Sequence, residues 1–253
     1  QVVKVSSNQK FKCFIIHLKR AKKRRAYVDE IISKLNIETE IIDAVDGRLL
    51  TENKILQYYS EKPLFEPAYP FKINKGEIGC FLSFRKAWQN IVDQNLAGGL
   101  IFEDDVSLNL NVFQHSFDTA LNWIEKHGYI QFQVRNVSKK IEIIKAYKKI
   151  NLLKPSPILL RCSAQLVSYS TAKRLLEITE RFDRPVDGLL QLNWSTGVEV
   201  TTITPSGVMD NTNASGGSNL SLNIPFTLKI KQEYNRIKYR YNIKKNAKIH
   251  DKL

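Results

Sequence analysis

Cysteine and histidine are scarce in this chain. Its 253 residues contain three cysteines, Cys13, Cys80 and Cys162, which lie far apart and beside apolar neighbours. This spacing fits neither a disulfide framework nor a zinc site, and the four histidines are scattered without metal-ligand spacing. The pattern instead predicts buried, reduced thiols, as is typical of a cytosolic protein.

Long apolar runs and phosphate-loop motifs are also missing. No stretch approaches the roughly 20 apolar residues that span a bilayer, and residues 1–10 lack the apolar core of a secretory signal. The chain does not begin with Met, so a leader in a longer protein is left open. No G-x-x-x-x-G-K-[ST] sequence is present. The length and the 43% hydrophobic content fit one large α/β domain, or one domain with an appendage.

Acidic residues are too few to balance the basic ones, and the net charge is +14. Residues 227–253 hold nine Lys and Arg against Glu233 and Asp251, a net charge of +7 and half of the total. Such a segment suits an anionic surface such as phospholipid, lipopolysaccharide core or nucleic acid. A basic tail that is merely solvated fits equally well. We therefore divide the chain into a domain at residues 1–225 and a basic tail at residues 226–253.

The most informative stretch is residues 98–106, where two glycines and three apolar residues precede Glu103, Asp104 and Asp105. The run predicts a buried strand with the acids at its exit, beside a cleft, because a buried strand does not tolerate unpaired carboxylates. Side chains alternate along a strand, so Glu103 and Asp105 point one way and Asp104 the other. Two carboxylates on one side suit a hard divalent cation that a phosphate also ligates. The alternative is a solvated acidic turn.

A basic turn follows the first predicted strand, at residues 11–18. Apolar residues at helical spacing come next, so the unit is a strand, a basic turn and a helix. The carboxyl end of a parallel strand is where α/β sheets bind ligands, and Arg suits bidentate contacts with a diphosphate. A solvated first turn of the helix is the alternative. The cations of this turn are Lys19, Arg20, Lys22, Lys23, Arg24 and Arg25.

The remaining pattern alternates strands with helices, which predicts a mainly parallel sheet with helices on both faces. Asn74 is expected to cap a helix, with Glu77 three residues later. Residues 205–225 are rich in Gly, Ser and Asn and predict a lid or an ordinary connector, while residues 138–154 fit no element clearly. Strands are predicted at residues 40–45, 129–134, 157–170 and 198–204, and helices at 51–59, 113–124, 171–181 and 189–194.

Several of these segments, taken in order, resemble glycosyltransferase family 25, the lipooligosaccharide and lipopolysaccharide β-glycosyltransferases. The resemblance covers roughly residues 11–205 and is sharpest at the Gly-Glu-Ile-Gly-Cys-Phe-Leu-Ser sequence of residues 76–83. That segment lies about 25 residues before the Glu-Asp-Asp triplet. Further matches are the strand with its basic turn, the Ala-Val-Asp-Gly sequence at 44–47, the Leu-Val-Ser sequence at 166–168 and the Pro-Val-Asp sequence at 185–187.

The resemblance implies a GT-A-like fold with a single nucleotide-binding α/β core. It implies inverting transfer of a hexose, galactose or glucose, from a UDP-sugar to a lipid-linked oligosaccharide of the lipooligosaccharide or lipopolysaccharide type. Asp105 would ligate Mn²⁺ or Mg²⁺, with Glu103 sharing the metal or touching the donor. The implied donor-binding residues are Leu18, Arg20, Arg24, Glu103 and Asp104. Such an enzyme works in the cytoplasm near the inner membrane, whose anionic surface the basic tail would contact.

An inverting displacement also needs a general base from a different loop than the metal-binding acids. Asp187, in a Pro-Val-Asp-Gly turn, is the first candidate and Glu77 the second. Each has a structural alternative, since Asp187 can cap the helix at 189–194 and Glu77 can complete the capping box of Asn74. The family usually has histidine at the position of Phe84. If that histidine contacts the sugar donor or the acceptor in relatives, this chain lacks the contact.

Two other function classes compete with the glycosyltransferase. Nucleic-acid binding would use the positive charge, but the charge lies in separate clusters without a recognised module, and we predict no nucleic-acid partner. A metal-dependent nucleotide enzyme such as a nucleotidyltransferase is the second class, and the missing glycine-rich phosphate loop weakens it.

Overall fold

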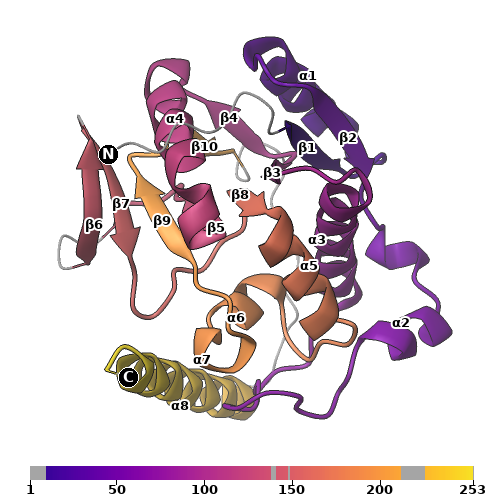
Figure 1. Ribbon diagram of the computed structural model, residues 1–253. Coiled ribbons are helices and arrows are strands. Elements are labelled where there is room, and N and C mark those ends of the chain that lie inside the picture. Colours follow the sequence, from indigo (N-terminus) through magenta and orange to yellow (C-terminus); the bar gives the residue numbers. More distant parts are fainter. Residues whose placement is uncertain (1–9, 138–140, 148, 212–225, 253) are drawn as a thin grey trace.

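The computed structural model describes residues 10–137, 141–147, 149–211 and 226–252. Its centre is an eight-stranded sheet, and a two-stranded sheet pairs β4 (Val106–Leu108) with β10 (Val208–Asp210) (Figure 1). The strands of the large sheet are, in spatial order, β2 (Thr39–Asp43), β1 (Phe11–His17), β3 (Gly98–Glu103), β8 (Ala164–Ser168), β5 (Tyr129–Phe132), β9 (Thr201–Thr204), β7 (Ile150–Lys154) and β6 (Glu142–Tyr147).

Most strands of this sheet run in one direction. β1 is parallel to β2 and β3, and β5 is parallel to β9. β8 is antiparallel to both β3 and β5, and β7 is antiparallel to both β9 and β6. Only β7 and β8 therefore oppose the other strands of the described sheet. The predicted α/β class with a mainly parallel sheet is confirmed.

Helices cover both faces of the sheet, as predicted (Figure 1). Successive strand residues point to opposite faces, so Phe14 belongs to one core cluster and Cys13 to the other. The first cluster includes buried residues of α3 (Lys75–Asp93) and α5 (Tyr169–Ile178). The second includes residues of α1 (Arg25–Lys34) and α4 (Leu110–His127).

The strand order changes direction at β1. From β1 the chain passes through α1 to β2 on one side, and it then returns through α3 to β3 on the other side of β1. β1 and β3 are parallel, with Ile16 opposite Glu103, so their carboxyl ends meet at the same edge. In open α/β sheets a ligand binds outside the carboxyl ends of the strands at such a switch point.

Several element boundaries differ from the sequence predictions. The strand expected at 157–170 begins only at Ala164, and the helix expected at 189–194 is two short helices, α6 (Val186–Leu190) and α7 (Asn193–Thr196). The lysine-rich stretch at 138–154 forms the antiparallel pair β6 and β7 in its described part. β10 lies within the predicted loop at 205–225, of which residues 212–225 lie outside the described chain. α2 (Glu52–Tyr58) follows the expectation.

The C-terminal basic segment is a helix, α8 (Phe226–His250), along the outside of the molecule beside α7 (Figure 1). Its Tyr239 and Ile243 are buried against Leu192. Within the described residues, no helix combines the length and apolar character that crossing a bilayer requires. The division at residue 225 stays a prediction.

Candidate active site

The Glu103-Asp104-Asp105 triplet lies at the carboxyl end of β3, where the sequence pattern places it. β3 ends at Glu103, and the other two acids form the turn into β4. Asp104 and Asp105 are only 4% and 8% exposed, and Glu103 is partly buried. The triplet is therefore not the solvated acidic turn of the alternative interpretation.

Asp104 joins the end of β1 to the end of β3. Its Oδ2 atom accepts hydrogen bonds from His17 Nδ1 at 2.8 Å and from the Leu18 backbone nitrogen at 3.1 Å. Its Oδ1 atom accepts one from Arg24 Nη1 at 2.9 Å. Both oxygens thus bind protein groups, and Leu18 takes part through its backbone. Direct contact of Leu18 or Asp104 with a donor stays a prediction.

Arg24 brings the basic turn to the carboxylates. Its Nη1 atom lies 2.9 Å from Asp104 Oδ1 and 3.3 Å from Asp105 Oδ2. Burial alone would lower the pKa of Arg24, but the hydrogen bond to Asp104 and the charge of Asp105 outweigh it, so the net shift is upward. Arg20 lies apart from this group, because its Nε atom pairs with Asp46 Oδ2 at 2.7 Å, after β2.

Glu103 has a raised pKa. Burial raises its pKa first, the Asp105 and Asp104 carboxylates raise it further, and a hydrogen bond from Ser163 lowers it in part, which leaves a pKa of about 8. Burial is therefore the main cause of the raised pKa, and repulsion from the two neighbouring carboxylates adds to it. Three carboxylates with Arg24 as their basic partner therefore form a site that favours an added cation.

Asp187 reaches this cluster from a separate element. It lies in the first turn of α6, whose N-cap is Pro185, so the predicted N-cap role of Asp187 is wrong. Its Oδ1 atom accepts a hydrogen bond from the Gly188 nitrogen at 2.8 Å, and its Oδ2 atom accepts one from the Arg161 nitrogen at 3.3 Å. The negative charge of Asp187 contributes, after burial and the other two acids, to the raised pKa of Glu103, so Asp187 lies near enough to the cluster to interact with it electrostatically.

Arg161 is a site residue that sequence reasoning missed. Its backbone has a φ of +95°, a left-handed conformation that costs energy for a residue with a Cβ atom. Its nitrogen binds Asp187, and its Nη1 atom lies 3.0 Å from Asp210 Oδ2 in β10. Asp210 pairs in register with Val106, directly after the triplet. No local sequence signal marks Arg161, because only the fold brings its loop to the acids.

The carboxylates of the cluster suit a metal ion only if a bound molecule supplies further oxygen ligands. Among the described residues, no three His, Cys, Asp or Glu side chains are grouped as a complete metal site. Asp105 and Glu103 offer two carboxylates, and the charge of Asp105 is one cause of the raised pKa of Glu103, so a bound cation would relieve the repulsion between them. Mg²⁺ is commonly bound through one or two carboxylates plus phosphate oxygens. The residues therefore fit a metal that arrives with a diphosphate.

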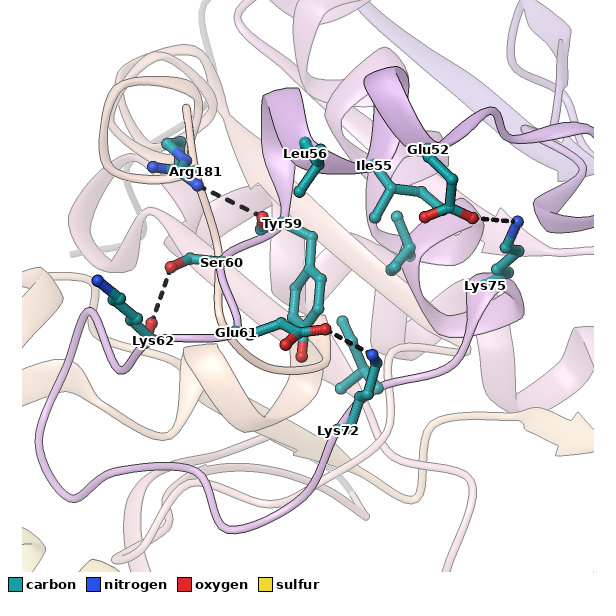
Figure 2. Close-up of a pocket in the computed structure, with 12 residues that line it drawn as sticks. Glu52, Ile55, Leu56, Tyr59, Ser60, Glu61, Lys62, Lys72, Lys75 and Arg181 are labelled. Carbon is teal, nitrogen blue, oxygen red and sulfur yellow. Dashed lines mark hydrogen bonds and ion pairs between the residues drawn. The ribbon is translucent and has the colours of Figure 1, made fainter.

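A cavity of about 530 Å³ lies elsewhere, between α2, residues 59–62 and the start of α3 (Figure 2). None of the predicted site residues lines it. Its rim carries lysines that already have acidic partners, Lys72 with Glu61 at 2.5 Å and Lys75 with Glu52 at 3.0 Å. Lys62 and Arg181 also line the cavity, so its lining has more cations than acids, the opposite of the carboxylate cluster.

The family comparison agrees with this geometry. Residues 10–190 match the family model described as glycosyltransferase family 25 (LPS biosynthesis protein), which includes β1, the triplet and Asp187. The chain belongs to glycosyltransferase family 25. The resemblance seen in the sequence motifs is thereby confirmed.

Curated relatives within family 25 match part of the chain. Procollagen galactosyltransferase 2 of Mus musculus is 36% identical over 110 residues, 43% of this chain and 17% of that protein. Procollagen galactosyltransferase 1-A of Xenopus laevis is 31% identical over 119 residues, 44% and 20% of the two chains. Inactive glycosyltransferase 25 family member 3 of Mus musculus is 38% identical over 103 residues, 39% and 17%. The chain thus spans about a fifth or less of these proteins.

Two solved structures show a weaker likeness. A Drosophila β-1,4-galactosyltransferase 7 mutant in complex with manganese, UDP-Gal and xylobiose has a TM-score of 0.42 and 10% identity, over 87% of this chain and 79% of that one. A glycosyltransferase involved in glycosylation of the major capsid of PBCV-1 has a TM-score of 0.34 and 13% identity, over 68% and 64%.

The sharpest family 25 motif holds the backbone beside the site. A Cβ atom on Gly79 would lie 2.5 Å from the Val45 carbonyl oxygen, and one on Gly47 would lie 2.1 Å from the Lys75 carbonyl oxygen, so both positions require glycine. The Ser83 hydroxyl donates to the Gly79 carbonyl at 2.7 Å and accepts from the Val45 nitrogen at 2.8 Å. The motif therefore fixes α3 against the segment that follows β2.

Glu77 and Phe84 of the same motif region have structural positions. Glu77 completes the predicted capping box: its Oε2 atom accepts from the Asn74 nitrogen at 2.7 Å, and its nitrogen donates to Asn74 Oδ1 at 3.0 Å. A catalytic role for Glu77 stays a prediction. Phe84 is 1% exposed in the core, with its ring 6.3 Å from that of Trp88. The departure from the family histidine therefore changes the core and not a ligand-facing surface.

Proposed function

We propose that this family 25 protein transfers a hexose from a UDP-sugar to a glycan hydroxyl group. The observation that carries the proposal is the unbalanced carboxylate cluster at the switch point between β1 and β3. Glu103, Asp104 and Asp105 gather there beside Arg24, and such a group of carboxylates suits a divalent cation bound to a nucleoside diphosphate.

Asp105 and Glu103 would hold the metal ion, Mn²⁺ or Mg²⁺. The metal would stabilise the negative charge that develops on the leaving diphosphate. Arg24 lies beside both Asp104 and Asp105, and its positive charge would lie next to the same diphosphate. Arg161 adds a second cation at the edge of the site, where it is paired with Asp210.

Asp187 is the general base of the proposed inverting reaction. It comes from α6, a different element from the one that carries the metal-binding acids, as an attack from the opposite side of the sugar requires. The backbone nitrogens of Arg161 and Gly188 orient its carboxylate. Asp187 would take the proton of the attacking acceptor hydroxyl as the bond to the sugar forms and the bond to UDP breaks.

The proposed donor sugar is galactose or glucose, and the proposed acceptor is a lipid-linked oligosaccharide of the lipopolysaccharide type. The family description names lipopolysaccharide biosynthesis, and two of the relatives are named galactosyltransferases. Such an acceptor would be extended at the cytoplasmic face of the inner membrane, and the basic α8 fits that setting.

A transfer assay tests this function. The protein is incubated with UDP-galactose or UDP-glucose and a delipidated oligosaccharide acceptor, with Mn²⁺ or with chelator, and both UDP release and acceptor mass are measured. We expect a mass gain of one hexose that requires metal and disappears in Asp187→Asn. Asp118→Asn, which alters an exposed acid on α4 outside the cluster, is the matched control and should stay active.

Two results would overturn the proposal. The first is sugar transfer that chelator leaves unchanged. The second is the absence of transfer and of UDP-sugar binding together with salt-dependent DNA retention that persists in Asp105→Asn, which would favour nucleic-acid binding instead.

A further inference from the structure

The C-terminal helix α8 has one face that packs on the protein and an opposite face that is exposed. One face docks on the protein, where Tyr239, Ile243 and Ala247 are buried. The Tyr239 hydroxyl also lies 3.1 Å from Nη1 of the buried Arg184, and its ring contacts that of Tyr69 edge-on at 5.4 Å. This face holds the helix firmly against α7 and the segment before α6.

The opposite face carries an exposed apolar row. Ile230, Tyr234, Ile237 and Tyr241 are spaced by four, three and four residues. At about 100° per residue, these positions stay within roughly a 60° sector of the helix. The buried Tyr239 lies about 180° from the centre of that sector. The side chains of the row are 57–66% exposed although all are large and apolar or aromatic. Its members are Ile230, Tyr234, Ile237 and Tyr241.

Cations surround this row and extend it. Lys244, Lys245 and Lys248 continue the same side of the helix after Tyr241, and all are exposed. Glu233 is the only acid within residues 230–250, and it pairs with Arg236. The other exposed cations of this stretch are Lys231, Lys238 and Arg240. We call the apolar row together with Lys244, Lys245 and Lys248 the outer face of α8.

We propose that the outer face of α8 binds the surface of an anionic lipid bilayer, with the helix lying in the plane of the interface. A helix that combines an apolar row with flanking lysines inserts the row at the boundary between headgroups and acyl chains, while the lysines meet anionic headgroups. Figure 1 shows α8 at the border of the molecule, where a flat surface can approach it. The inference stands apart from the proposed sugar transfer, because vesicle binding involves no catalytic step.

Charge argues against two other occupants. In a second copy of the chain, the same face would bring Lys244, Lys245 and Lys248 against another cationic helix, and like charges oppose such pairing. A nucleic acid would satisfy the lysines, but it offers its phosphate backbone and not an apolar layer to an exposed isoleucine and tyrosine row.

Vesicle co-sedimentation of the whole chain is the test. The probes are phosphatidylcholine vesicles with and without about 30% phosphatidylglycerol. Because each lysine near an anionic surface contributes about 1 kcal/mol, the triple variant Lys244→Gln, Lys245→Gln, Lys248→Gln should bind anionic vesicles on the order of 100-fold more weakly. The variant Tyr234→Ser, Ile237→Ser, Tyr241→Ser should bind anionic vesicles at least 20-fold more weakly, since it removes three of the four apolar side chains of the row.

Matched controls change the same residue types elsewhere. Lys54, Lys126 and Lys173 are exposed lysines on other helices, and Leu49 and Leu56 are exposed leucines. Gln at the three lysines and Ser at the two leucines should leave vesicle binding within about twofold of the parent. Transfer of sugar to a soluble acceptor should be unchanged in both outer-face variants, which separates this inference from the enzymatic one.

Three results would overturn the inference. One is equal binding of the parent to neutral and anionic vesicles, or no binding to either. Another is outer-face variants that bind anionic vesicles as the parent does. The third is a parent that sediments as a dimer in analytical ultracentrifugation and becomes a monomer in the serine variant without change in vesicle binding, which would assign the face to a second copy.

Discussion

Two sites in this protein bury carboxylates beside arginine, and they are balanced differently. At the first, Arg184 is fully buried and donates from Nε to Asp183 Oδ1 at 2.7 Å and from Nη2 to Oδ2 at 2.9 Å. The same guanidinium also donates to the carbonyls of Phe65 and Pro67. One acid thus pairs with one base, and backbone carbonyls together with the Tyr239 hydroxyl satisfy the rest of the arginine.

At the second site, Arg24 serves Asp104 and Asp105 together while Glu103 adds a third carboxylate. The pKa values register the difference. Burial alone would raise the pKa of Asp183, but Arg184 and backbone donors outweigh it and the net shift is downward. The pKa of Glu103 instead rises to about 8. A balanced buried pair leaves no uncompensated charge in the fold, whereas a surplus of acid is typical of a site that binds a cation.

The largest expected effect is on activity, from Asp105→Asn. Removing one metal ligand should lower kcat/KM by a factor of about 10³ or more, because the leaving diphosphate loses its cation. The free energy of unfolding should stay within about 1 kcal/mol of the parent, since one repulsive charge is lost as well. Transfer kinetics and urea unfolding measure the two quantities. A variant that keeps full activity would remove the metal role of Asp105.

The next effect concerns the balanced pair. Arg184→Met should lower the free energy of unfolding by about 3–5 kcal/mol, because Asp183 is left buried without its partner. Adding Asp183→Asn should recover part of that loss, since no unpaired charge remains. Urea denaturation of the three proteins provides the comparison. If the single and double variants are equally unstable, the charge pairing is not what stabilises this region.

Phe84→His introduces the residue usual in the family. Phe84 is buried in the core, so an imidazole there should cost about 2 kcal/mol of stability for lack of a polar partner. The KM for the UDP-sugar should not change. A lower KM in the histidine variant would show that this position reaches the ligand after all.

The smallest effect is a pH dependence. A carboxyl group whose pKa is raised by folding stabilises the fold below its unfolded value of about 4.5 and loses that contribution as pH rises through about 8. Glu103→Gln should therefore gain stability over the parent between these pH values. The gain at pH 8 should be on the order of 1–2 kcal/mol, reduced by partial exposure to solvent. Melting temperatures of both proteins at pH 5 and pH 8 measure it, and parallel curves would contradict the raised pKa.

Local signals predicted the parts of the fold that depend on local chemistry. The glycine pair, the apolar run and the acids located β3 and its exit, and the Asn74–Glu77 spacing located the start of α3. β6 escaped prediction because it is an exposed edge strand without an apolar alternation. Such a strand forms through its pairing with β7 and leaves little trace in its own sequence.

The sequence predicted only those residues of the candidate site that lie in a recognisable segment. The acids, Arg24 and Asp187 each stand out in a recognisable stretch. His17 and Arg161 do not, because their roles arise from contacts with residues 87 and 26 positions away. The family pattern also singled out Phe84, whose place in the core only the packing of α3 reveals.

The central claim is that the carboxylate cluster binds a UDP-sugar together with a divalent cation. Isothermal titration of UDP-galactose into the parent and into Asp105→Asn, each with Mn²⁺ and with chelator, tests it most directly. The account predicts binding by the parent only in the presence of Mn²⁺, and at least 100-fold weaker binding by the variant. Equal affinity of the parent with Mn²⁺ and with chelator would contradict it.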